Sequence, residues 1–404
     1  MNLDNLNVLF FGGCYSETEK ARYFDLCIHG YQSAAQVHQE AILRGFIQNN
    51  VDVEVLSLPF LPSFPFNYRS VIVKSCDFIL DSKCIGKSMG MINLPYFKYN
   101  EGKVLKEISE WNDRKRGDKV ILLYSLNYFW FRVALLAKQK FADIHFSVVV
   151  PDLPIFCETG RASRFLGKEN NQLDYITNNI HLFDSFVLLS EPMAEALNVN
   201  DKPYLVVEGV YNQISTNIEP EIRDRKYILY TGKLSVEFGL KDLVDAFLKT
   251  SNKDIDLVLC GDGNMVSYIK ECAKKDLRIQ FLGTVTNEKC VQLQRGAYLL
   301  VNPRHSYEEF TKYSFPSKTF EYMASGVPTL MCKLQCLPEE YKTHLLLFDM
   351  EDVDNMAKKI EQVLKIPEAE LRRIGDEARR FILEKKTPKA QMFALCKFLY
   401  GQFH

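Results

Sequence analysis

Short runs of apolar, β-branched and aromatic residues alternate along the chain with longer stretches in which apolar residues recur every three or four positions. The short runs are almost continuous in apolar character, which is typical of parallel strands covered on both faces. The longer stretches have the spacing of amphipathic helices. In the first half this pattern predicts strands at residues 7–11, 51–58, 120–125, 144–150, 184–190 and 204–209, with helices at 33–48 and 128–140.

The second half repeats the same alternation. It predicts strands at residues 226–232, 255–261, 278–283, 297–303, 327–332 and 344–349, followed by amphipathic helices at 353–364 and 368–384. Two series of strands that alternate with helices predict an α/β protein with two doubly wound, Rossmann-like domains.

The polar stretch at residues 211–226 separates the two series of strands. We therefore predict an N-terminal domain at 1–213, a C-terminal domain at 214–386, and a helix at 387–404 that can cross back to the first domain. Residues 62–99 are aromatic, carry lysines and show few strand signals, so they predict an elaborated loop region. Their stretch "FPFNYRSVIVK" suits either packing within the protein or contact with a membrane surface.

Composition and charge limit the choice of partner and compartment. A net charge of -1 over 404 residues supplies no basic field for nucleic acid. The 11 cysteines form no CxxC pair, which favours reduced thiols over a disulfide framework or a zinc site. Without a signal-peptide pattern or an apolar run of about 18 residues, a cytoplasmic protein is expected. Contact with the inner face of the membrane is left open.

The stretch "YSFPSKTFEYMASGVP", at residues 313–328, is the strongest candidate for a binding site. It predicts a helix with Pro316 in its first turn and Gly326 as its stop. One polar stripe follows the helix: Ser314, Ser317, Lys318, Glu321 and Ser325. The pair Lys318 and Glu321 is either a solvated ion pair or a site where lysine meets phosphate and glutamate accepts two sugar hydroxyls.

Other loops predicted at the same sheet edge favour the binding site. Gly232 and Lys233 directly follow the first strand of the second domain, Gly261 and Gly263 follow the next strand, and Arg304 follows the strand at 297–303. The carboxyl ends of parallel strands share one edge, where doubly wound folds bind ligands. Glycine permits close approach of backbone, and the cations suit phosphate.

The ordered motifs "TGKL…GLKDLVDAF", "LCGDGN", "FLGTVTNEKCVQLQRGAYLLVNPR" and "YSFPSKTFEYMASGVPTL" resemble the donor-binding domain of family 4 retaining glycosyltransferases, over residues 227–347. The resemblance implies the GT-B fold, in which two Rossmann-like domains face a cleft. It also implies metal-independent hexosyl transfer with retention, without a cofactor. The donor would be a nucleotide-diphosphate sugar, with a UDP-sugar favoured, and the acceptor a saccharide or lipid-linked saccharide of surface polysaccharide or glycan biosynthesis.

The resemblance also implies roles for individual residues. Glu321 matches the glutamate that binds the donor ribose, and Val285 matches the loop whose backbone meets the base, beside Gly261 and Gly263. The diphosphate contacts would be Gly232, Lys233, Ser317, Lys318 and Thr319. Lys233 and Lys318 would stabilise the leaving group, and Asp152 of the first domain would orient a hydroxyl. Gly12 and Gly13 would let a substrate approach the backbone.

Two positions depart from the family pattern. Tyr313 stands where the family has its first motif glutamate, which contacts the donor sugar, and Phe238 stands near the position of a second lysine. Glu308 or Glu309 is a candidate replacement for the glutamate, and Lys318 with Arg304 for the lysine. Two other functions stay open: a nucleotide-sugar 2-epimerase, and a non-catalytic subunit that binds nucleotide sugar, which Tyr313 supports.

Overall fold

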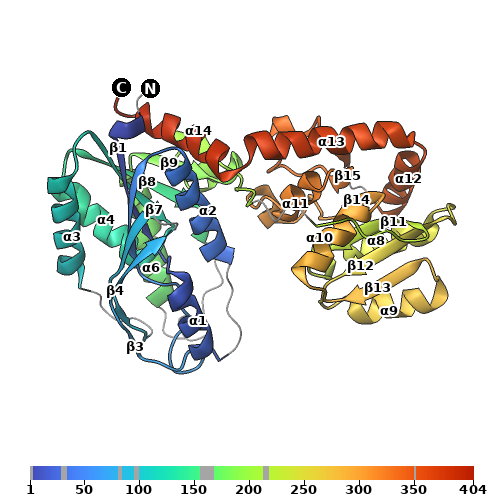
Figure 1. The fold of residues 1–404 in the computed structure, drawn as a ribbon, viewed down its shortest axis with the longest axis horizontal. Coiled ribbons are helices and arrows are strands. Elements are labelled where there is room, and N and C mark those ends of the chain that lie inside the picture. Colours follow the sequence, from blue (N-terminus) through green and yellow to red (C-terminus); the bar gives the residue numbers. More distant parts are fainter. Residues whose placement is uncertain are drawn as a thin grey trace. The chain divides into compact units, whose positions relative to one another are not determined.

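The computed structural model describes residues 3–28, 34–80, 84–94, 100–154, 168–212, 218–349 and 352–404. The chain divides into two compact units (Figure 1). The first comprises Met1–Val210 together with Pro388–His404, and the second comprises Tyr211–Thr387. Each unit is built on a mainly parallel sheet covered by helices, so the predicted pair of doubly wound α/β domains is confirmed.

The first unit contains an eight-stranded sheet of order β10-β9-β8-β7-β1-β2-β5-β4. Neighbouring strands are parallel except for β4 and β5, which form an antiparallel hairpin at one edge. Its strands are β1 (Leu6–Gly12), β2 (Asp52–Ser57), β4 (Cys76–Leu80), β5 (Cys84–Ser88), β7 (Asp118–Tyr124), β8 (Ile144–Val150), β9 (Ser185–Leu188) and β10 (Tyr204–Val206). The six strands predicted from the first half all occur, with ends shifted by at most three residues.

Helices cover both faces of this sheet, with α3 and α4 on one side and α2 on the other (Figure 1). The helices are η1 (Leu3–Asn5), α1 (Glu17–Leu26), α2 (Ala34–Gln48), α3 (Glu101–Arg114), α4 (Tyr128–Lys140), α6 (Lys168–Asn179), η3 (Ile180–Leu182), α7 (Pro192–Ala196) and α14 (Pro388–Tyr400). Met392, Leu395 and Leu399 of α14 are buried in the same core as Ile42 and Phe46 of α2, which ties the end of the chain to the first unit.

The prediction of a strand-poor loop region at residues 62–99 is wrong. That region contains the hairpin of β4 and β5, and a second antiparallel pair forms between β3 (Ile72–Val73) and β6 (Met91–Ile92). In β4 only Phe78 is buried, because an edge strand faces solvent on one side. Such strands lack the continuous apolar run that marks the central strands, so the pattern used for the rest of the chain missed them.

The second unit has a fully parallel six-stranded sheet of order β13-β12-β11-β14-β15-β16. This is the 3-2-1-4-5-6 order of the Rossmann fold. Its strands are β11 (Lys226–Thr231), β12 (Ile255–Cys260), β13 (Ile279–Gly283), β14 (Leu299–Asn302), β15 (Thr329–Cys332) and β16 (Leu346–Phe348). All six were predicted, because each central strand is buried on both faces and its sequence is almost purely apolar.

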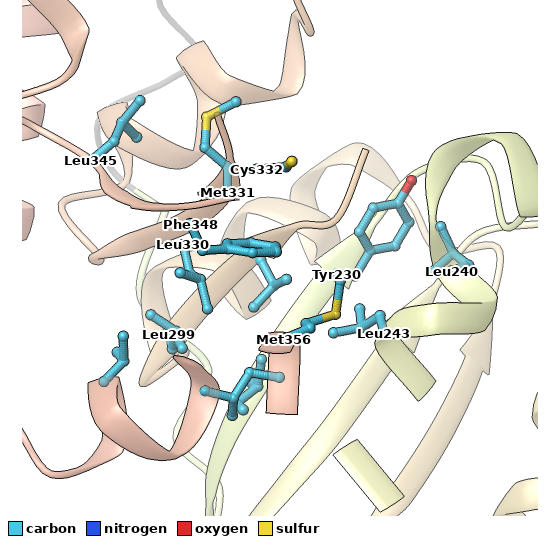
Figure 2. Close-up of a cluster of buried hydrophobic side chains, with 14 of the residues drawn as sticks. Tyr230, Leu240, Leu243, Leu299, Leu330, Met331, Cys332, Leu345, Phe348 and Met356 are labelled. Atoms are coloured by element: carbon cyan, nitrogen blue, oxygen red, sulfur yellow. The ribbon is translucent and has the colours of Figure 1, made fainter. Parts of the chain in front are cut away.

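The helices of the second unit are η4 (Val236–Phe238), α8 (Leu240–Lys249), α9 (Val266–Lys275), α10 (Asn287–Gly296), η5 (Glu309–Lys312), α11 (Lys318–Ala324), η6 (Glu339–Tyr341), α12 (Val353–Leu364) and α13 (Glu368–Lys385). Figure 2 shows the core in which side chains from α8 and α12 pack against those of the central strands, among them Tyr230, Leu299 and Leu330. No helix of the described residues has the length and apolar character needed to cross a membrane.

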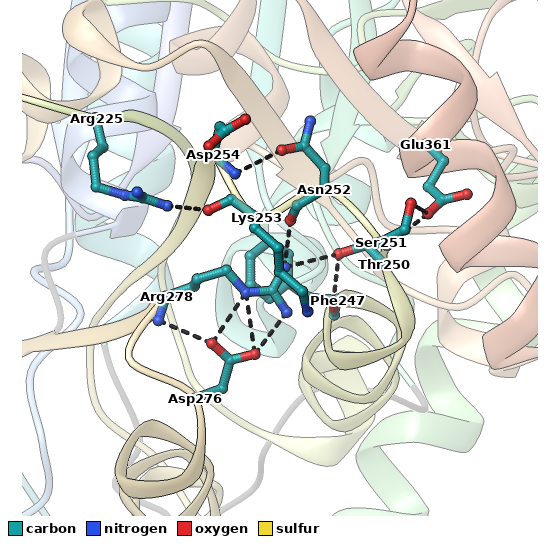
Figure 3. A network of polar contacts seen from close by, with 10 residues as sticks. All are labelled: Arg225, Phe247, Thr250, Ser251, Asn252, Lys253, Asp254, Asp276, Arg278 and Glu361. Carbon is teal, nitrogen blue, oxygen red and sulfur yellow. Dashed lines mark hydrogen bonds and ion pairs between the residues drawn. The ribbon is translucent and has the colours of Figure 1, made fainter.

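The amino edge of the second sheet is held by a buried arginine (Figure 3). Arg278 is only 7% exposed, and its Nε donates to both carboxylate oxygens of Asp276 at 3.0 and 3.1 Å. Its Nη1 donates to the Asn252 carbonyl at 2.5 Å, and its guanidinium lies 4.8 Å from the centroid of the Phe247 ring. The network links the loops that lead into β12 and β13, so its role is structural.

Candidate functional site

The order of the second sheet reverses between β11 and β14, which are neighbours in space. Doubly wound folds bind ligands outside the carboxyl ends of the strands at such a switch point. The loop after Thr231, the last residue of β11, carries Gly232 and Lys233, and the loop after β14 carries Arg304. The structure therefore brings these three predicted residues to one edge of the sheet.

Glycines let these loops pack closely on one another. Gly239 has a φ of 74°, and a Cβ atom there would lie 2.0 Å from the Pro303 carbonyl oxygen. Gly261 has a φ of 138°, and a Cβ atom there would lie 1.7 Å from the Gly232 carbonyl oxygen. Larger residues are excluded at both positions by sterics. The predicted loop glycines thus bring the edge loops together, in addition to any approach to a ligand.

Arg304 is the most unusual residue at this edge. It is only 6% exposed, and its guanidinium lies 4.6 Å from the ring centroid of Phe310 and 5.7 Å from that of Phe238. Its Nε has no hydrogen-bond partner, and no carboxylate among the described residues forms an ion pair with it. Burial lowers its pKa. A buried cation without a counter-charge is costly, so this arrangement favours a bound anion.

A further buried polar atom, Nδ1 of His305, the residue that follows Arg304, lacks a partner among the residues that the structure describes. The His305 Nε2 lies 3.1 Å from the Asp242 carboxylate, so it carries the proton and Nδ1 is an acceptor. Burial lowers the pKa of His305 in spite of Asp242. The neutral imidazole can therefore accept a hydrogen bond from a ligand hydroxyl.

On α11, Lys318 and Glu321 form an ion pair of 2.8 Å, and both side chains are partly exposed. Burial acts to lower the pKa of Lys318, but the Glu321 carboxylate outweighs it, and the pKa of Lys318 is raised. Only Oε2 of Glu321 is engaged by this lysine. Among the described residues no side chain hydrogen-bonds to the second carboxylate oxygen, so the pair keeps capacity for a ligand.

Sequence reasoning missed Tyr322, which fixes α11 to the sheet. Its buried hydroxyl accepts a hydrogen bond from the Thr231 N–H at 2.8 Å and donates to the Thr231 carbonyl at 3.2 Å. Because Thr231 ends β11, this contact holds Glu321 beside the switch point. A tyrosine on the buried side of a helix gives no sequence signal of this role.

The other residues predicted to contact the donor lie at or near this edge with varied exposure. Lys233 and Ser317 are exposed, whereas the Thr319 hydroxyl is buried and lies 4.0 Å from the Met331 sulfur. Val285 and Tyr313 are partly buried. Because α11 is only seven residues long, we attribute the positive charge here mainly to side chains. The donor contacts of these residues stay predictions.

In the first unit, Gly12 and Gly13 are occupied by contacts within the protein. The Gly12 carbonyl accepts from Trp130 Nε1 at 3.0 Å, and the Gly13 N–H donates to Gln39 at 2.8 Å. A Cβ atom at Gly13 would lie 2.6 Å from the Phe60 ring. These glycines pack the protein's own side chains in this structure, and their contact with a substrate stays a prediction.

Asp152 follows β8 at the carboxyl edge of the first sheet, and partial burial raises its pKa. At the end of the neighbouring strand β7, the Tyr124 hydroxyl lies 3.1 Å from Nδ1 of His38 on α2. Burial lowers the pKa of His38 to about 4, so its imidazole is neutral at pH 7. The place of His38 at this edge is apparent only in the structure.

Residues 213–381 match the family model described as Glycosyl transferases group 1. The matched residues lie in the second unit, which holds the switch-point site, so this unit is similar to the group 1 glycosyltransferases. Curated protein sequences contain no match to this chain.

Solved glycosyltransferase structures share the fold of the whole chain. A lipopolysaccharide outer core galactosyltransferase, WaaB, in its apo form, has 15% identity, a TM-score of 0.60, and coverage of 98% of this chain and 99% of its own. Sucrose-phosphate synthase from Thermosynechococcus elongatus gives the same four values. Anabaena Alr3699/HepE, in complex with UDP, has 12% identity, a TM-score of 0.59, and coverage of 98% and 100%. These likenesses establish the GT-B fold.

Phe238 and Tyr313, the two positions that depart from the group 1 pattern, can be compared with their surroundings in the structure. Phe238 stands near the position where a second lysine is expected, and its ring faces the guanidinium of Arg304. The structure therefore has a buried cation, Arg304, beside the position at which Phe238 replaces the expected lysine. Glu308, a candidate replacement for the glutamate that Tyr313 replaces, is partly buried. Its carboxylate lies close enough to His305 to act against the larger effect of burial, which lowers the pKa of His305.

Proposed function

We propose that this protein is a glycosyltransferase that moves a hexosyl group from a nucleotide-diphosphate sugar, a UDP-sugar by preference, to a saccharide or lipid-linked saccharide acceptor. The reaction proceeds with retention, without a metal ion, in polysaccharide or glycan biosynthesis. The observation that carries the proposal is the buried Arg304, without a carboxylate partner in the described chain, at the switch point of a Rossmann sheet. A diphosphate supplies the missing negative charge.

In this proposal the donor occupies the carboxyl edge of the second unit. Glu321 accepts hydrogen bonds from the ribose hydroxyls, and Arg304, Lys233 and Lys318 surround the diphosphate. The unpartnered Nδ1 of His305 accepts a hydrogen bond from a hydroxyl of the transferred sugar. The group 1 family match over residues 213–381 supports this assignment, as does the UDP in the structure of HepE.

The chemistry follows from the charge that develops on the leaving group. When the bond between the anomeric carbon and the diphosphate breaks, negative charge grows on the phosphate oxygens, and preorganised cations stabilise it. The acceptor hydroxyl attacks the anomeric carbon from the face of the leaving group and passes its proton to the donor phosphate. Asp152, which follows β8 at the carboxyl edge of the first sheet, orients the acceptor hydroxyl, because its carboxylate can accept a hydrogen bond from that hydroxyl.

Incubation with a panel of nucleotide sugars distinguishes this function from the alternatives. Release of free nucleotide, with a rate that rises when saccharide acceptors are added, is expected. Interconversion of the donor without release would indicate a 2-epimerase instead. Binding of a nucleotide sugar without turnover under any acceptor would indicate a non-catalytic subunit, the reading that Tyr313 favours.

The two helix residues provide a direct test of the donor site. Glu321→Ala and Lys318→Ala are each expected to weaken binding of the preferred nucleotide sugar by roughly 10- to 100-fold, because each removes a hydrogen bond to a charged group. Calorimetric titration measures this change. Glu370→Ala is the matched control, since Glu370 and Arg373 form an ion pair of similar length on α13. Unchanged affinity in both α11 variants would refute the site.

A further inference from the structure

The first unit contains a cavity of about 440 Å³ that the proposed donor chemistry does not use. It lies between the two-stranded sheet of β3 and β6 and the first turns of α3 and α4. Most of its lining is apolar: Leu58, Val73, Met89, Met91, Val104 and Phe129. Its volume is within the range of small-molecule sites, roughly 300–1,000 Å³.

The cavity adjoins the edge at which the first unit carries Asp152. Leu58 directly follows β2, and Phe129 lies in the first turn of α4, which begins after β7. The carboxyl ends of β2, β7 and β8 share one edge of the sheet because these strands are parallel. A molecule with its chain in the cavity would thus have its other end at the sheet's ligand-binding edge.

Two lysines at the cavity have no counter-charge in the part of the chain that the structure describes. Lys74 and Lys103 both line it and are both exposed, and no carboxylate of the described residues pairs with either. Neighbouring lysines do have partners: Lys87 lies 2.5 Å from Glu107, and Lys106 lies 3.6 Å from Glu110. Two unpaired cations beside an apolar cavity complement a ligand with an apolar chain and an anionic group.

The apolar surface continues from the cavity to the outside. Ile72 lines the cavity and yet is 59% exposed, and Ile92, its cross-strand partner, also lines it and is exposed. Such side chains at the mouth let an apolar chain enter without crossing a polar rim.

We propose that this cavity binds the hydrocarbon chain of an amphiphile that carries a phosphate or diphosphate group, with Lys74 and Lys103 holding the anionic group. The identity of this amphiphile as the lipid-linked acceptor rests on the proposed function. Binding itself needs no donor, so it is tested separately.

Calorimetric titration of the full chain with alkyl phosphates, from butyl to decyl phosphate, tests the site in the absence of nucleotide sugar. The affinity is expected to rise about three- to fourfold for each added methylene until the cavity is filled. Inorganic phosphate is expected not to bind, and decanol to bind about tenfold more weakly than decyl phosphate. Affinity independent of chain length, or binding of inorganic phosphate as tight as that of decyl phosphate, would overturn the proposal.

Surface variants that do not threaten the fold locate the site. Ile72→Asp is expected to weaken decyl phosphate binding at least about tenfold, because it places a charge at the mouth. The control is Ile79→Asp, at a site 63% exposed on β4 that does not line the cavity, and it is expected to have no effect. Equal losses in the two variants would contradict the site.

The double variant Lys74→Gln/Lys103→Gln is expected to weaken decyl phosphate binding but not decanol binding, and Lys106→Gln is expected to change neither. Retained affinity for decyl phosphate in the double variant would contradict the role of the lysines. A protein that transfers sugars but does not bind alkyl phosphates contradicts this proposal alone. A protein that binds them but never turns over nucleotide sugars contradicts only the proposed function.

Discussion

Arg304→Met is expected to lower the affinity for the nucleotide sugar by about 100-fold or more, while leaving the protein as stable as before or more stable. Arg304 is buried between two aromatic rings, with no carboxylate partner in the described chain. Methionine has a similar length and no charge, so it removes the cost of a buried, uncompensated cation. It also removes charge-assisted hydrogen bonds to phosphate, which together contribute about 3 kcal/mol.

Titration with the donor and thermal unfolding measure the two effects on the same preparation. Arg304→Lys is a graded control, because lysine keeps the charge but cannot make the bidentate contact of a guanidinium with phosphate. We expect its affinity to fall between those of the wild type and Arg304→Met. A variant Arg304→Met that unfolds more easily but binds the donor normally would show that the arginine serves only the fold.

Arg278→Met is expected to have the opposite consequence, a loss of about 3–5 kcal/mol in the stability of the second unit with no change in donor affinity. Arg278 is buried as deeply as Arg304, but its guanidinium is fully engaged by Asp276 and by the Asn252 carbonyl (Figure 3). Removing the side chain leaves the Asn252 carbonyl without its donor and the Asp276 carboxylate with only the backbone N–H of residue 278. The network lies at the amino edge of the sheet, opposite the proposed donor site.

Asp276 predicts a pH signature for this loss. The hydrogen bonds from Arg278 lower the pKa of Asp276, against the effect of burial. The carboxylate therefore contributes stability above its unfolded pKa of about 4, and this contribution is lost as the pH falls through the lower folded pKa. The acid-dependent loss should shrink in Arg278→Met.

Calorimetry of wild type and Arg278→Met between about pH 7 and pH 3 measures this signature, with the transition of each unit followed separately. The same acid-dependent loss in both proteins would contradict the role of the pair.

The contrast between these two arginines shows what the sequence could and could not predict. Arg304 lies in the loop after β14, and Arg278 lies in the loop before β13. The residues next to each arginine in the sequence do not indicate which of the two forms an ion pair with a carboxylate. Asp276 lies two residues from Arg278, but an acidic residue, Glu308, also lies four residues from Arg304. Only the packed loops reveal that Asp276 neutralises Arg278, whereas no carboxylate in the described part of the chain neutralises Arg304.

The region at residues 62–99 shows a second limit. The central strands were predictable because burial on both faces demands a continuous apolar run. The short strands β3 to β6 bury few side chains and leave residues such as Ile79 exposed, so their sequence does not differ from that of an apolar loop. The cavity beneath β3 and β6 therefore could not be predicted from the hydrophobic pattern of the sequence.

The sequence by itself determined the two α/β units, the positions of their central strands, and the cations and carboxylates that gather at the edge of the second sheet. It did so because strand burial and helix spacing are periodic along the chain. The tertiary structure alone decided that Tyr322 fixes α11 to β11, that Arg304 meets no counter-charge among the described residues, and that His38 reaches Tyr124. These facts depend on distances between segments far apart in sequence, which no local pattern contains.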